Sequence, residues 1–148
     1  MVDSTRLVLI TGATGYVGTA VATRIAKRYR VRAVDTQLFG NAIADVPNIE
    51  FVKADITDYG AMFSAMMDVT DVIHLAGIVT DELVDMNYLK AMRVNLLGTQ
   101  TVVRAASQRL NRHDVRRFVY ASSSSIYGAQ QEVATEETKP QPQSVYAA

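Results

Sequence analysis

The chain has 148 residues, of which 49% are hydrophobic and 20% charged, a composition typical of a soluble domain with a buried core. Its 15 Lys and Arg residues balance 15 Asp and Glu residues, so charge indicates neither a nucleic-acid nor a membrane partner. The absence of cysteine excludes disulfides, thiolate metal sites and a cysteine nucleophile; no metal site is predicted. The apolar run 7–10 is too short for a signal or membrane-spanning segment, so a cytoplasmic location is expected.

Short apolar segments alternate with amphipathic ones along the chain. The first, RLVLIT, is continuously apolar, as in a strand of a parallel sheet that is covered on both faces. Strands are predicted at residues 6–11, 29–35, 49–55, 71–77 and 116–124.

Helical periodicity separates these strands. In the first helix Val17, Val21, Ile25 and Tyr29 lie four residues apart and form one apolar stripe. A short helix is predicted from the spacing of Tyr59, Met62, Phe63 and Met66. A long helix is predicted over residues 88–110, with one apolar side formed by Leu89, Met92, Leu96, Val103 and Leu110.

This alternation predicts right-handed βαβ units and therefore an α/β fold, a Rossmann-type doubly wound parallel sheet of about five strands. Such a sheet binds its ligand at the carboxyl ends of the strands. Small or polar residues follow the predicted strands at these ends: Gly12, Asp35, Asp55, Gly77 and Ser122.

The first turn, TGATGYVG, places Gly12, Gly15 and Gly18 three residues apart between a strand and a helix. A phosphate must approach the backbone closely there, and the free amides at the helix start then hold the anion. Asp35 ends the second strand, twenty residues after Gly15, where its carboxylate can accept hydrogen bonds from ribose hydroxyls. It would repel a 2′-phosphate, so the pattern favours NAD over NADP; the structural alternative is a residue that caps a turn.

With these motifs the chain resembles the extended short-chain dehydrogenase/reductases, in particular the NAD-dependent nucleotide-sugar epimerase/dehydratase group, over the N-terminal half of such an enzyme. The segments that carry the resemblance occur in the family's order: TGATGYVG, DTQLFG, ADITD, HLAG, RVNLLGT, SSSSIYG and PQPQSVYAA. One departure is Val79, where epimerases of the UDP-galactose type often have a lysine.

The resemblance implies one NAD(P)-binding Rossmann domain over residues 1–148, followed in the family by a C-terminal substrate domain. It implies NAD contacts from Gly12, Gly15, Tyr16, Val17, Gly18, Asp35, Asp55, Ile56, Leu75, Ala76, Gly77 and Asn95. Asn95 could equally bond to neighbouring backbone and fix the helix. His74, in an apolar strand, is interpreted as a core histidine rather than a catalyst.

The family's catalytic serine and tyrosine align with Ser123 and Tyr146, with a slip to Ser122 or Ser124 left open. The tyrosine begins a Tyr-x-x-x-Lys motif in the family, and its lysine would fall at position 150, two residues past Ala148. A free tyrosine titrates near pH 10, so forming the phenolate at pH 7 without help costs about 4 kcal/mol. A nearby ammonium lowers that pKa and makes the tyrosine a usable base.

Three interpretations of the function remain open on the sequence. The first is the NAD-binding part of an epimerase or dehydratase that acts on a nucleotide sugar by transient hydride transfer, with a homo-oligomer as a further partner. The second is a stand-alone NAD-binding module without turnover, and the third an extended reductase acting on a steroid- or flavonoid-like substrate. The 148-residue chain alone is expected to bind NAD weakly, not to turn over, and to expose the edge of its fifth strand.

Overall fold

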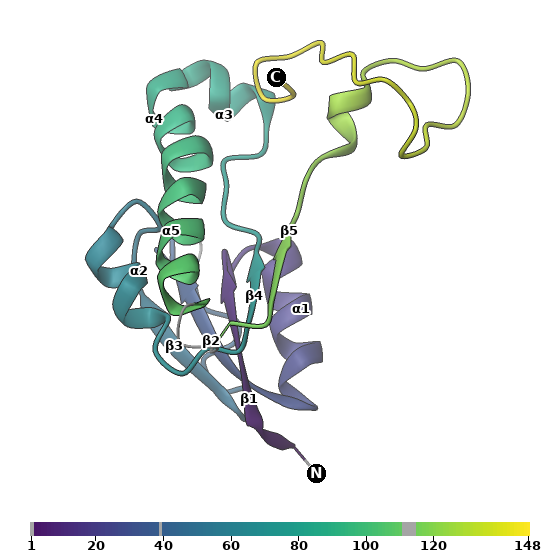
Figure 1. Cartoon of the computed structure of the whole chain (residues 1–148). Coiled ribbons are helices and arrows are strands. Elements are labelled where there is room, and N and C mark those ends of the chain that lie inside the picture. The colour runs from purple at the N-terminus through teal and green to yellow at the C-terminus, as the bar shows by residue number, and fades with distance from the viewer. Residues whose placement is uncertain (1, 39, 111–114) are drawn as a thin grey trace.

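The computed structural model describes residues 2–38, 40–110 and 115–148. Within them, parallel strands form one sheet in the order β3-β2-β1-β4-β5 (Figure 1). The strands are β1 (Asp3–Thr11), β2 (Tyr29–Asp35), β3 (Ile49–Lys53), β4 (Asp71–His74) and β5 (Arg117–Tyr120). The predicted doubly wound α/β fold is confirmed, and each predicted strand is present with slightly different limits.

Helices cover both faces of this sheet. The helical segments of the described residues are α1 (Tyr16–Ala26), α2 (Tyr59–Ala65), α3 (Asp81–Met86), α4 (Tyr88–Met92), a π-helical segment (Arg93–Gly98), α5 (Thr99–Leu110) and a 3₁₀ turn (Ser124–Tyr127). Helix α1 lies against one face, and α2 and α5 lie against the other. The first helix ends at Ala26, before Tyr29, because Tyr29 already belongs to β2. Helix α3 was not predicted.

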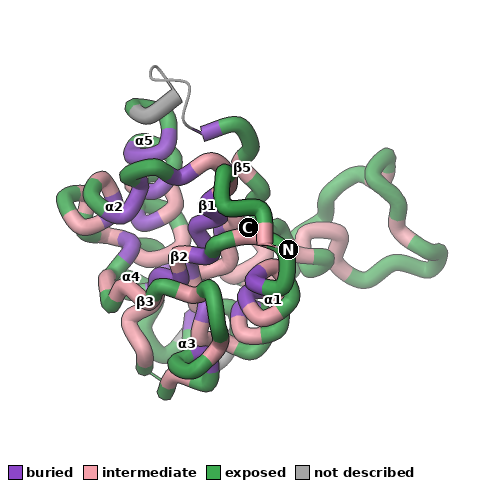
Figure 2. The backbone as a smooth tube through the Cα atoms, turned by 90° about the horizontal axis from the view of Figure 1, so that it is seen from below, coloured by how far each residue is buried: buried purple, intermediate pink, exposed green. Residues whose placement is uncertain are grey.

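Strand β1 lies at the centre of the sheet and is buried on both sides, as its apolar run predicts. Leu7 and Leu9 pack with α2 and α5, whereas Val8 and Ile10 pack with α1. All four side chains are at most 3% exposed. Burial of this kind stabilises the fold by about 1.5–3 kcal/mol for each large aliphatic side chain. Figure 2 shows buried residues concentrated in this central part of the molecule.

The predicted helical stretch 88–110 is present, but its predicted apolar side is not its buried side. Leu89, Met92, Leu96 and Val103 are between 39% and 78% exposed; the side chain of Leu110 lies outside the described residues. The buried positions are instead Ala91, Gly98, Val102, Ala105 and Ala106. Small side chains let the helix pack closely, and the large apolar residues are left partly exposed, Met92 and Leu96 beside a cavity.

The amino ends of the central strands are held by an ion pair. The Arg6 guanidinium donates two hydrogen bonds to the Asp71 carboxylate and lies 4.7 Å from the centre of the Tyr29 ring. Burial alone would raise the pKa of Asp71, but hydrogen bonds from Arg6 and Thr70 outweigh it and hold that pKa below its usual value. This end of the sheet is opposite to the end at which a ligand is expected.

The segment after β5 is largely exposed. In Figure 1 it leaves the sheet, extends away from the body and returns toward α3, and in Figure 2 it projects beyond the rest of the chain. Its return is fixed where the Gln141 N–H donates to the Ile126 carbonyl at 2.8 Å, beside Gly128 at φ +65°. A Cβ on Gly128 would stand 2.2 Å from the Gln141 carbonyl oxygen, so the crossing requires glycine.

The edge strand β5 is partly uncovered, as expected, with Val119 53% and Tyr120 57% exposed. Among the described residues no helix is both long and apolar enough to cross a membrane.

Candidate functional site

The sheet reverses its winding direction between β1 and β4. The chain passes from β1 outward to β2 and β3, and then returns to place β4 on the other side of β1. A crevice opens at the carboxyl ends of the two strands that flank such a reversal. The glycine turn follows β1 at this point, and residues 75–77 follow β4.

The three glycines of the turn meet different surroundings. Gly12 has φ +68°, and a Cβ on it would stand 2.7 Å from the Ala76 backbone nitrogen. A Cβ on Gly18 would stand 1.9 Å from the Gly12 carbonyl oxygen. A Cβ on Gly15 would meet only that same oxygen, at 3.3 Å. Close packing of turn, strand and helix therefore requires Gly12 and Gly18, whereas at Gly15 a Cβ would have one tight backbone neighbour and no severe clash.

Gly15 is the residue directly before α1, where the backbone amides of a helix start can face an anion. Tyr16 and Val17 form the first residues of α1, and their side chains are 97% and 56% exposed. The turn therefore offers the backbone of Tyr16 and Val17 to a ligand, not a buried apolar contact. The apolar stripe predicted from Val17 is consequently exposed at its first position.

Asp35 lies at the end of β2, beside the glycine turn. One carboxylate oxygen accepts the Thr14 N–H at 3.1 Å, and the other accepts the Gln37 N–H at 2.8 Å. The turn-capping role considered for Asp35 is thus present. A carboxylate has lone pairs beyond these two hydrogen bonds, so it can also accept from a ligand hydroxyl. Asp35 links the turn to the next strand end.

The residues after β4 are joined to the long helical stretch by Asn95. Its side-chain oxygen accepts the Ile78 N–H, and its side-chain amide donates to the Ile78 carbonyl, both at 2.8 Å. Asn95 lies in the π-helical segment, where the widened turn directs this side chain at the strand end. The structural interpretation of Asn95 is confirmed. Its bond to Ile78 places it beside Leu75, Ala76 and Gly77, which line the same cavity.

Asp55 and Ile56 follow β3 at a greater distance from the switch point. The Asp55 carboxylate accepts hydrogen bonds from the N–H and the hydroxyl of Thr57, both at 2.8 Å. The Ile56 side chain is 5% exposed and packs in the core with α2 and α5. Any contact of Ile56 with a ligand is therefore restricted to its backbone.

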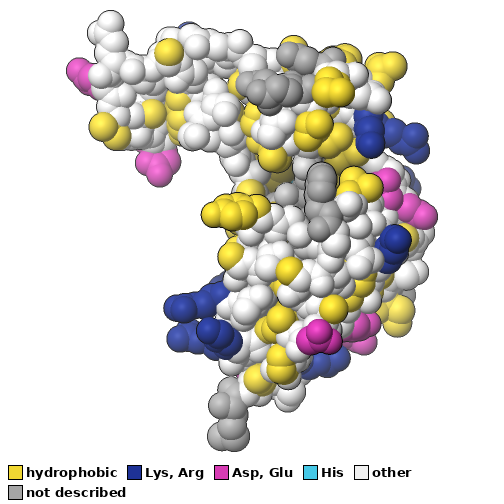
Figure 3. All heavy atoms as spheres, turned by 180° about the vertical axis from the view of Figure 1, so that it is seen from behind, with side chains coloured by type: hydrophobic (Ala, Val, Ile, Leu, Met, Phe, Trp, Pro, Cys, Tyr) yellow, Lys and Arg dark blue, Asp and Glu magenta, His cyan; other side chains and the backbone are white. Residues whose placement is uncertain are grey.

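A cavity of about 640 Å³ lies at the end of β4, and both predicted catalytic residues are in its wall. Ser123 and Tyr146 line it together with Gly77 and Asn95. Ser122 also lines this cavity, whereas Ser124 is not among its lining residues. Figure 3 shows the molecule hollowed between its body and the overhanging segment that follows β5. Two residues 23 positions apart in the sequence are thus placed on one ligand-sized space.

The Ser123 hydroxyl oxygen accepts the Ser125 N–H at 3.2 Å and begins the 3₁₀ turn. Because the oxygen serves as acceptor there, the hydroxyl proton can still be donated to another group. Tyr146 lies in one hydrogen-bonded turn in which the Ser144 hydroxyl and carbonyl both accept the Ala147 N–H at 3.2 Å. A serine in this position is typical of a helix start.

His74 is a satisfied core histidine, as interpreted. It is 1% exposed, and its two ring nitrogens lie 2.6 Å from the Thr11 hydroxyl oxygen and 2.9 Å from the Thr99 hydroxyl oxygen. Burial lowers the pKa of His74 to about 4, so the ring is neutral at pH 7. Neither Thr11 nor Thr99 was predicted from the sequence; a threonine in or beside a buried apolar segment is the pattern that could have indicated them.

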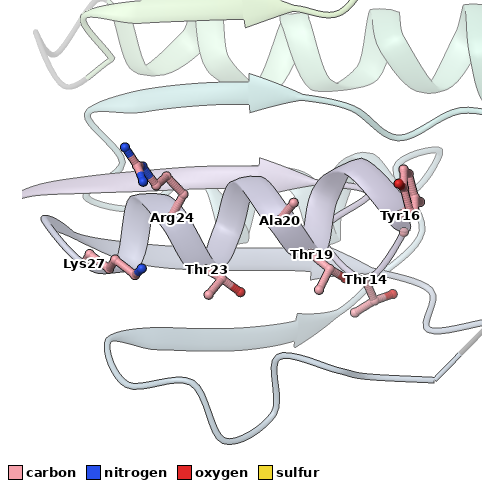
Figure 4. Close-up of a pocket in the computed structure, with 8 residues that line it drawn as sticks. Thr14, Tyr16, Thr19, Ala20, Thr23, Arg24 and Lys27 are labelled. Atoms are coloured by element: carbon pink, nitrogen blue, oxygen red, sulfur yellow. The ribbon is translucent and has the colours of Figure 1, made fainter.

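Another hollow, of about 560 Å³, runs along the outer face of α1. Figure 4 shows Thr14 and Tyr16 at its one end and Arg24 and Lys27 at the other. It contains Gly15 but neither Ser123 nor Tyr146. Within the described ranges, no group of three or more His, Asp or Glu side chains is placed to hold a metal ion.

The fold and the turn define a dinucleotide-binding protein of the doubly wound α/β class. A model of the NAD-dependent epimerase/dehydratase family matches residues 8–148, and the chain belongs to that family. The predicted family is therefore confirmed, and so is NAD as the family's cofactor.

Three relatives illustrate the range of this family. The chain is 38% identical over 124 residues to an NAD-dependent glucose-6-phosphate dehydrogenase of Haloferax volcanii, covering 82% of this chain and 45% of the relative. It is 30% identical to a 3 beta-hydroxysteroid dehydrogenase/Delta 5→4-isomerase of Mycobacterium tuberculosis, covering 90% of this chain and 36% of the relative. The crystal structure of the UDP-glucose 4-epimerase of Thermus thermophilus with NAD superposes with a TM-score of 0.82 at 28% identity, covering 95% and 46% of the respective chains.

The chain spans less than half the length of these relatives. Relatives of this kind carry a second portion, which the comparison does not cover.

Proposed function

We propose that this chain is the NAD-binding part of an enzyme that oxidises a sugar hydroxyl of a nucleotide sugar and then acts on the resulting ketone. The observation that carries the proposal is the joint cavity: Ser123 and Tyr146 line one space with Gly77 and Asn95, beside the glycine turn. Relatives solved with both NAD and a nucleotide sugar support it. The fit to NAD rests on the start of α1 at Gly15, which has no side-chain cap, and on the carboxylate of Asp35.

In this proposal the amides at the start of α1 hold the pyrophosphate, and Asp35 accepts hydrogen bonds from the adenosine ribose. The remaining residues proposed for the cofactor are Gly12, Gly18, Asp55, Ile56, Leu75 and Ala76, through their backbone or their packing. Asp35 would also repel a 2′-phosphate, which selects NAD over NADP. NAD supplies a hydride acceptor when it is bound.

Tyr146 is proposed as the base that removes the proton from the substrate hydroxyl. Ser123 is proposed to donate its hydroxyl proton in a hydrogen bond to the same substrate oxygen, for which that proton is available. An ammonium close to Tyr146, as in the family's Tyr-x-x-x-Lys motif, would lower the pKa of the phenol. In this proposal, one set of segments at the carboxyl ends of the strands holds the cofactor, and the segment after β5 acts on the substrate.

A second candidate substrate carries its hydroxyl group on an apolar ring system, as in a steroid. The observation that favours it is the apolar part of the cavity wall: Val79, Val84, Met92, Leu96, Ile126 and Val145. The similarity to a hydroxysteroid dehydrogenase agrees with it. A module that binds NAD without turnover is the remaining alternative, and we place the protein in the cytoplasm, as a homo-oligomer in the nucleotide-sugar case.

The test is a calorimetric titration of the protein with NAD and with NADP, for the natural sequence and for Asp35→Ala. We expect NAD to bind more tightly than NADP, and Asp35→Ala to weaken NAD binding about tenfold or more through loss of charge-assisted hydrogen bonds. Unchanged NAD affinity in Asp35→Ala would contradict the proposed cofactor site. Reduction of NAD by UDP- or dTDP-sugars, compared with hydroxysteroids, then separates the two substrate classes.

A further inference from the structure

His74 is a buried polar residue for which the proposed chemistry has no use. It ends β4 and is enclosed by β1, α5 and β5. Its ring lies 5.8 Å from the Tyr120 ring, nearly parallel to it, and 6.2 Å from the Phe118 ring. An apolar residue would fill this space without the need to satisfy two ring nitrogens. The presence of a hydrogen-bonded imidazole here, in place of an apolar side chain, therefore needs an explanation.

The surroundings of the Thr11 hydroxyl determine which nitrogen of His74 carries the proton. The Thr11 hydroxyl oxygen accepts the Ala76 N–H at 3.3 Å and the Leu75 N–H at 3.2 Å, the latter shared with the Thr11 carbonyl oxygen at 3.2 Å. With two N–H groups facing this oxygen, we assign its own proton to the hydrogen bond with His74 Nδ1, 2.6 Å away. Since the ring is neutral, its proton is on Nε2 and is donated to the Thr99 oxygen at 2.9 Å.

Each end of this chain of hydrogen bonds touches a segment of the candidate site. Thr11 directly precedes Gly12, whose Cα is closely packed against Ala76. Leu75 and Ala76 line the cavity, and Thr99 directly follows the π-helical segment that carries Asn95. The backbone of His74 extends the same connection to β5, because its carbonyl accepts the Ala121 N–H at 3.2 Å, just before Ser122.

We propose that His74 is a positioning residue: held as the Nε2–H tautomer between Thr11 and Thr99, it fixes the glycine turn, residues 75–77 and the helix of Asn95 in the relative arrangement that binds NAD. It is not a catalytic residue, because the ring is buried and both of its nitrogens are occupied. This role deepens the proposed function and rests on it, since the arrangement matters only if NAD binds here.

The test compares NAD affinity with stability in matched variants of the whole protein. His74→Phe keeps an aromatic ring but removes both hydrogen bonds, and we expect NAD affinity to fall about tenfold. Thr99→Val removes only the Nε2 partner at nearly constant volume and should lower affinity about threefold, whereas Thr99→Ser should restore it. Thr99→Val keeps the test valid if His74→Phe fails to fold.

The control is Val72→Ala, which removes a fully buried side chain from the same strand without touching the network. We expect it to lower the free energy of unfolding and to leave NAD affinity within about twofold of the natural protein. A second readout is the ¹⁵N NMR spectrum of the His74 ring, in which Nε2 should be protonated and Nδ1 unprotonated.

Two results would overturn the positioning role without affecting the proposed function. The first is that His74→Phe and Thr99→Val bind NAD as tightly as the natural protein does. The second is a His74 ring that is protonated on Nδ1. If Val72→Ala weakens NAD binding as much as His74→Phe, the effect is general loss of stability, and the role is again rejected. Failure of the natural protein to bind NAD would instead reject the proposed function itself.

Discussion

The two sides of the candidate site are built differently. On the proposed cofactor side, the glycine turn, Asp35 and residues 75–77 are joined to one another and to buried strands by hydrogen bonds and close backbone contacts. On the catalytic side, Ser123 and Tyr146 lie in a segment that leaves the body of the molecule and is held mainly by local turns. The first side is a part of the core, whereas the second is attached to it.

This difference predicts which mutations should change stability and which should change only binding or reactivity. Changes on the cofactor side disturb packing and binding together, because the same backbone serves both. Changes at Ser123 or Tyr146 can remove a reactive group and leave the fold unaffected, since both residues are only partly buried and lie outside the core.

The largest effect is expected at Gly18. In Gly18→Ala the new Cβ would stand 1.9 Å from the Gly12 carbonyl oxygen, so α1 or the turn must move, and the free energy of unfolding should fall by about 3 kcal/mol. Urea unfolding followed by circular dichroism measures it. The matched control is Gly15→Ala, where the nearest atom is 3.3 Å away. It should retain most of the stability and still lose NAD affinity; equal stability of the two variants would contradict the packing account.

His74 should make stability depend on pH. Burial lowers the pKa of His74 to about 4 from its usual value of 6.5, so between these values the unfolded chain binds more protons than the folded one. Stability is therefore complete above about pH 6.5 and is lost as the pH falls toward 4, by up to about 3 kcal/mol.

The pH dependence is isolated by comparing the natural protein with His74→Asn over this window. Asp71, whose pKa is held below its usual value, loses its contribution only at lower pH. His113 lies outside the described residues, and it is common to both proteins. A slope that persists unchanged in His74→Asn would show that another group is responsible.

A substitution at the opposite end of the sheet should lower stability and leave NAD affinity unchanged. Arg6→Ala leaves the Asp71 carboxylate in a largely buried place with one of its partners lost, and we expect a loss of about 2 kcal/mol in the free energy of unfolding. NAD affinity should stay unchanged, because Arg6 lies at the amino ends of the strands. Calorimetric titration checks it, and weakened binding would mean that the two ends are coupled.

The smallest effect on stability is expected at Tyr146. Removal of its hydroxyl in Tyr146→Phe should change the free energy of unfolding by less than about 0.5 kcal/mol, since the residue lies in a short turn near the surface. In a protein that also carries the family's lysine and second portion, the same change should abolish reduction of NAD by the substrate. Thermal unfolding and single-turnover absorbance of the reduced cofactor measure the two quantities; a large loss of stability would show that the segment is part of the core.

The sequence predicts the strands and the glycine turn well because their signals are local. A continuously apolar strand, glycines that the backbone requires and an acid at the next strand end each reflect a short-range constraint. In residues 88–110 the apolar spacing identifies a helix but not its buried side, because small residues such as Ala91, Gly98 and Ala105 are buried while the large apolar ones are partly exposed. Similarly, the partners of His74 come from two distant segments, which no spacing along the chain reveals.

The catalytic side is predicted from the resemblance to a family rather than from physical patterns. Nothing local requires Tyr146 to return to the cavity; the crossing of Gln141 over Gly128 brings it there.

The most direct test of the central claim is a crystal structure of the protein with NAD. The account predicts the pyrophosphate at the amides of Tyr16 and Val17, the adenosine ribose on Asp35, and the nicotinamide in the cavity of Ser123 and Tyr146. A dinucleotide bound elsewhere, for example along the outer hollow of α1, would contradict it.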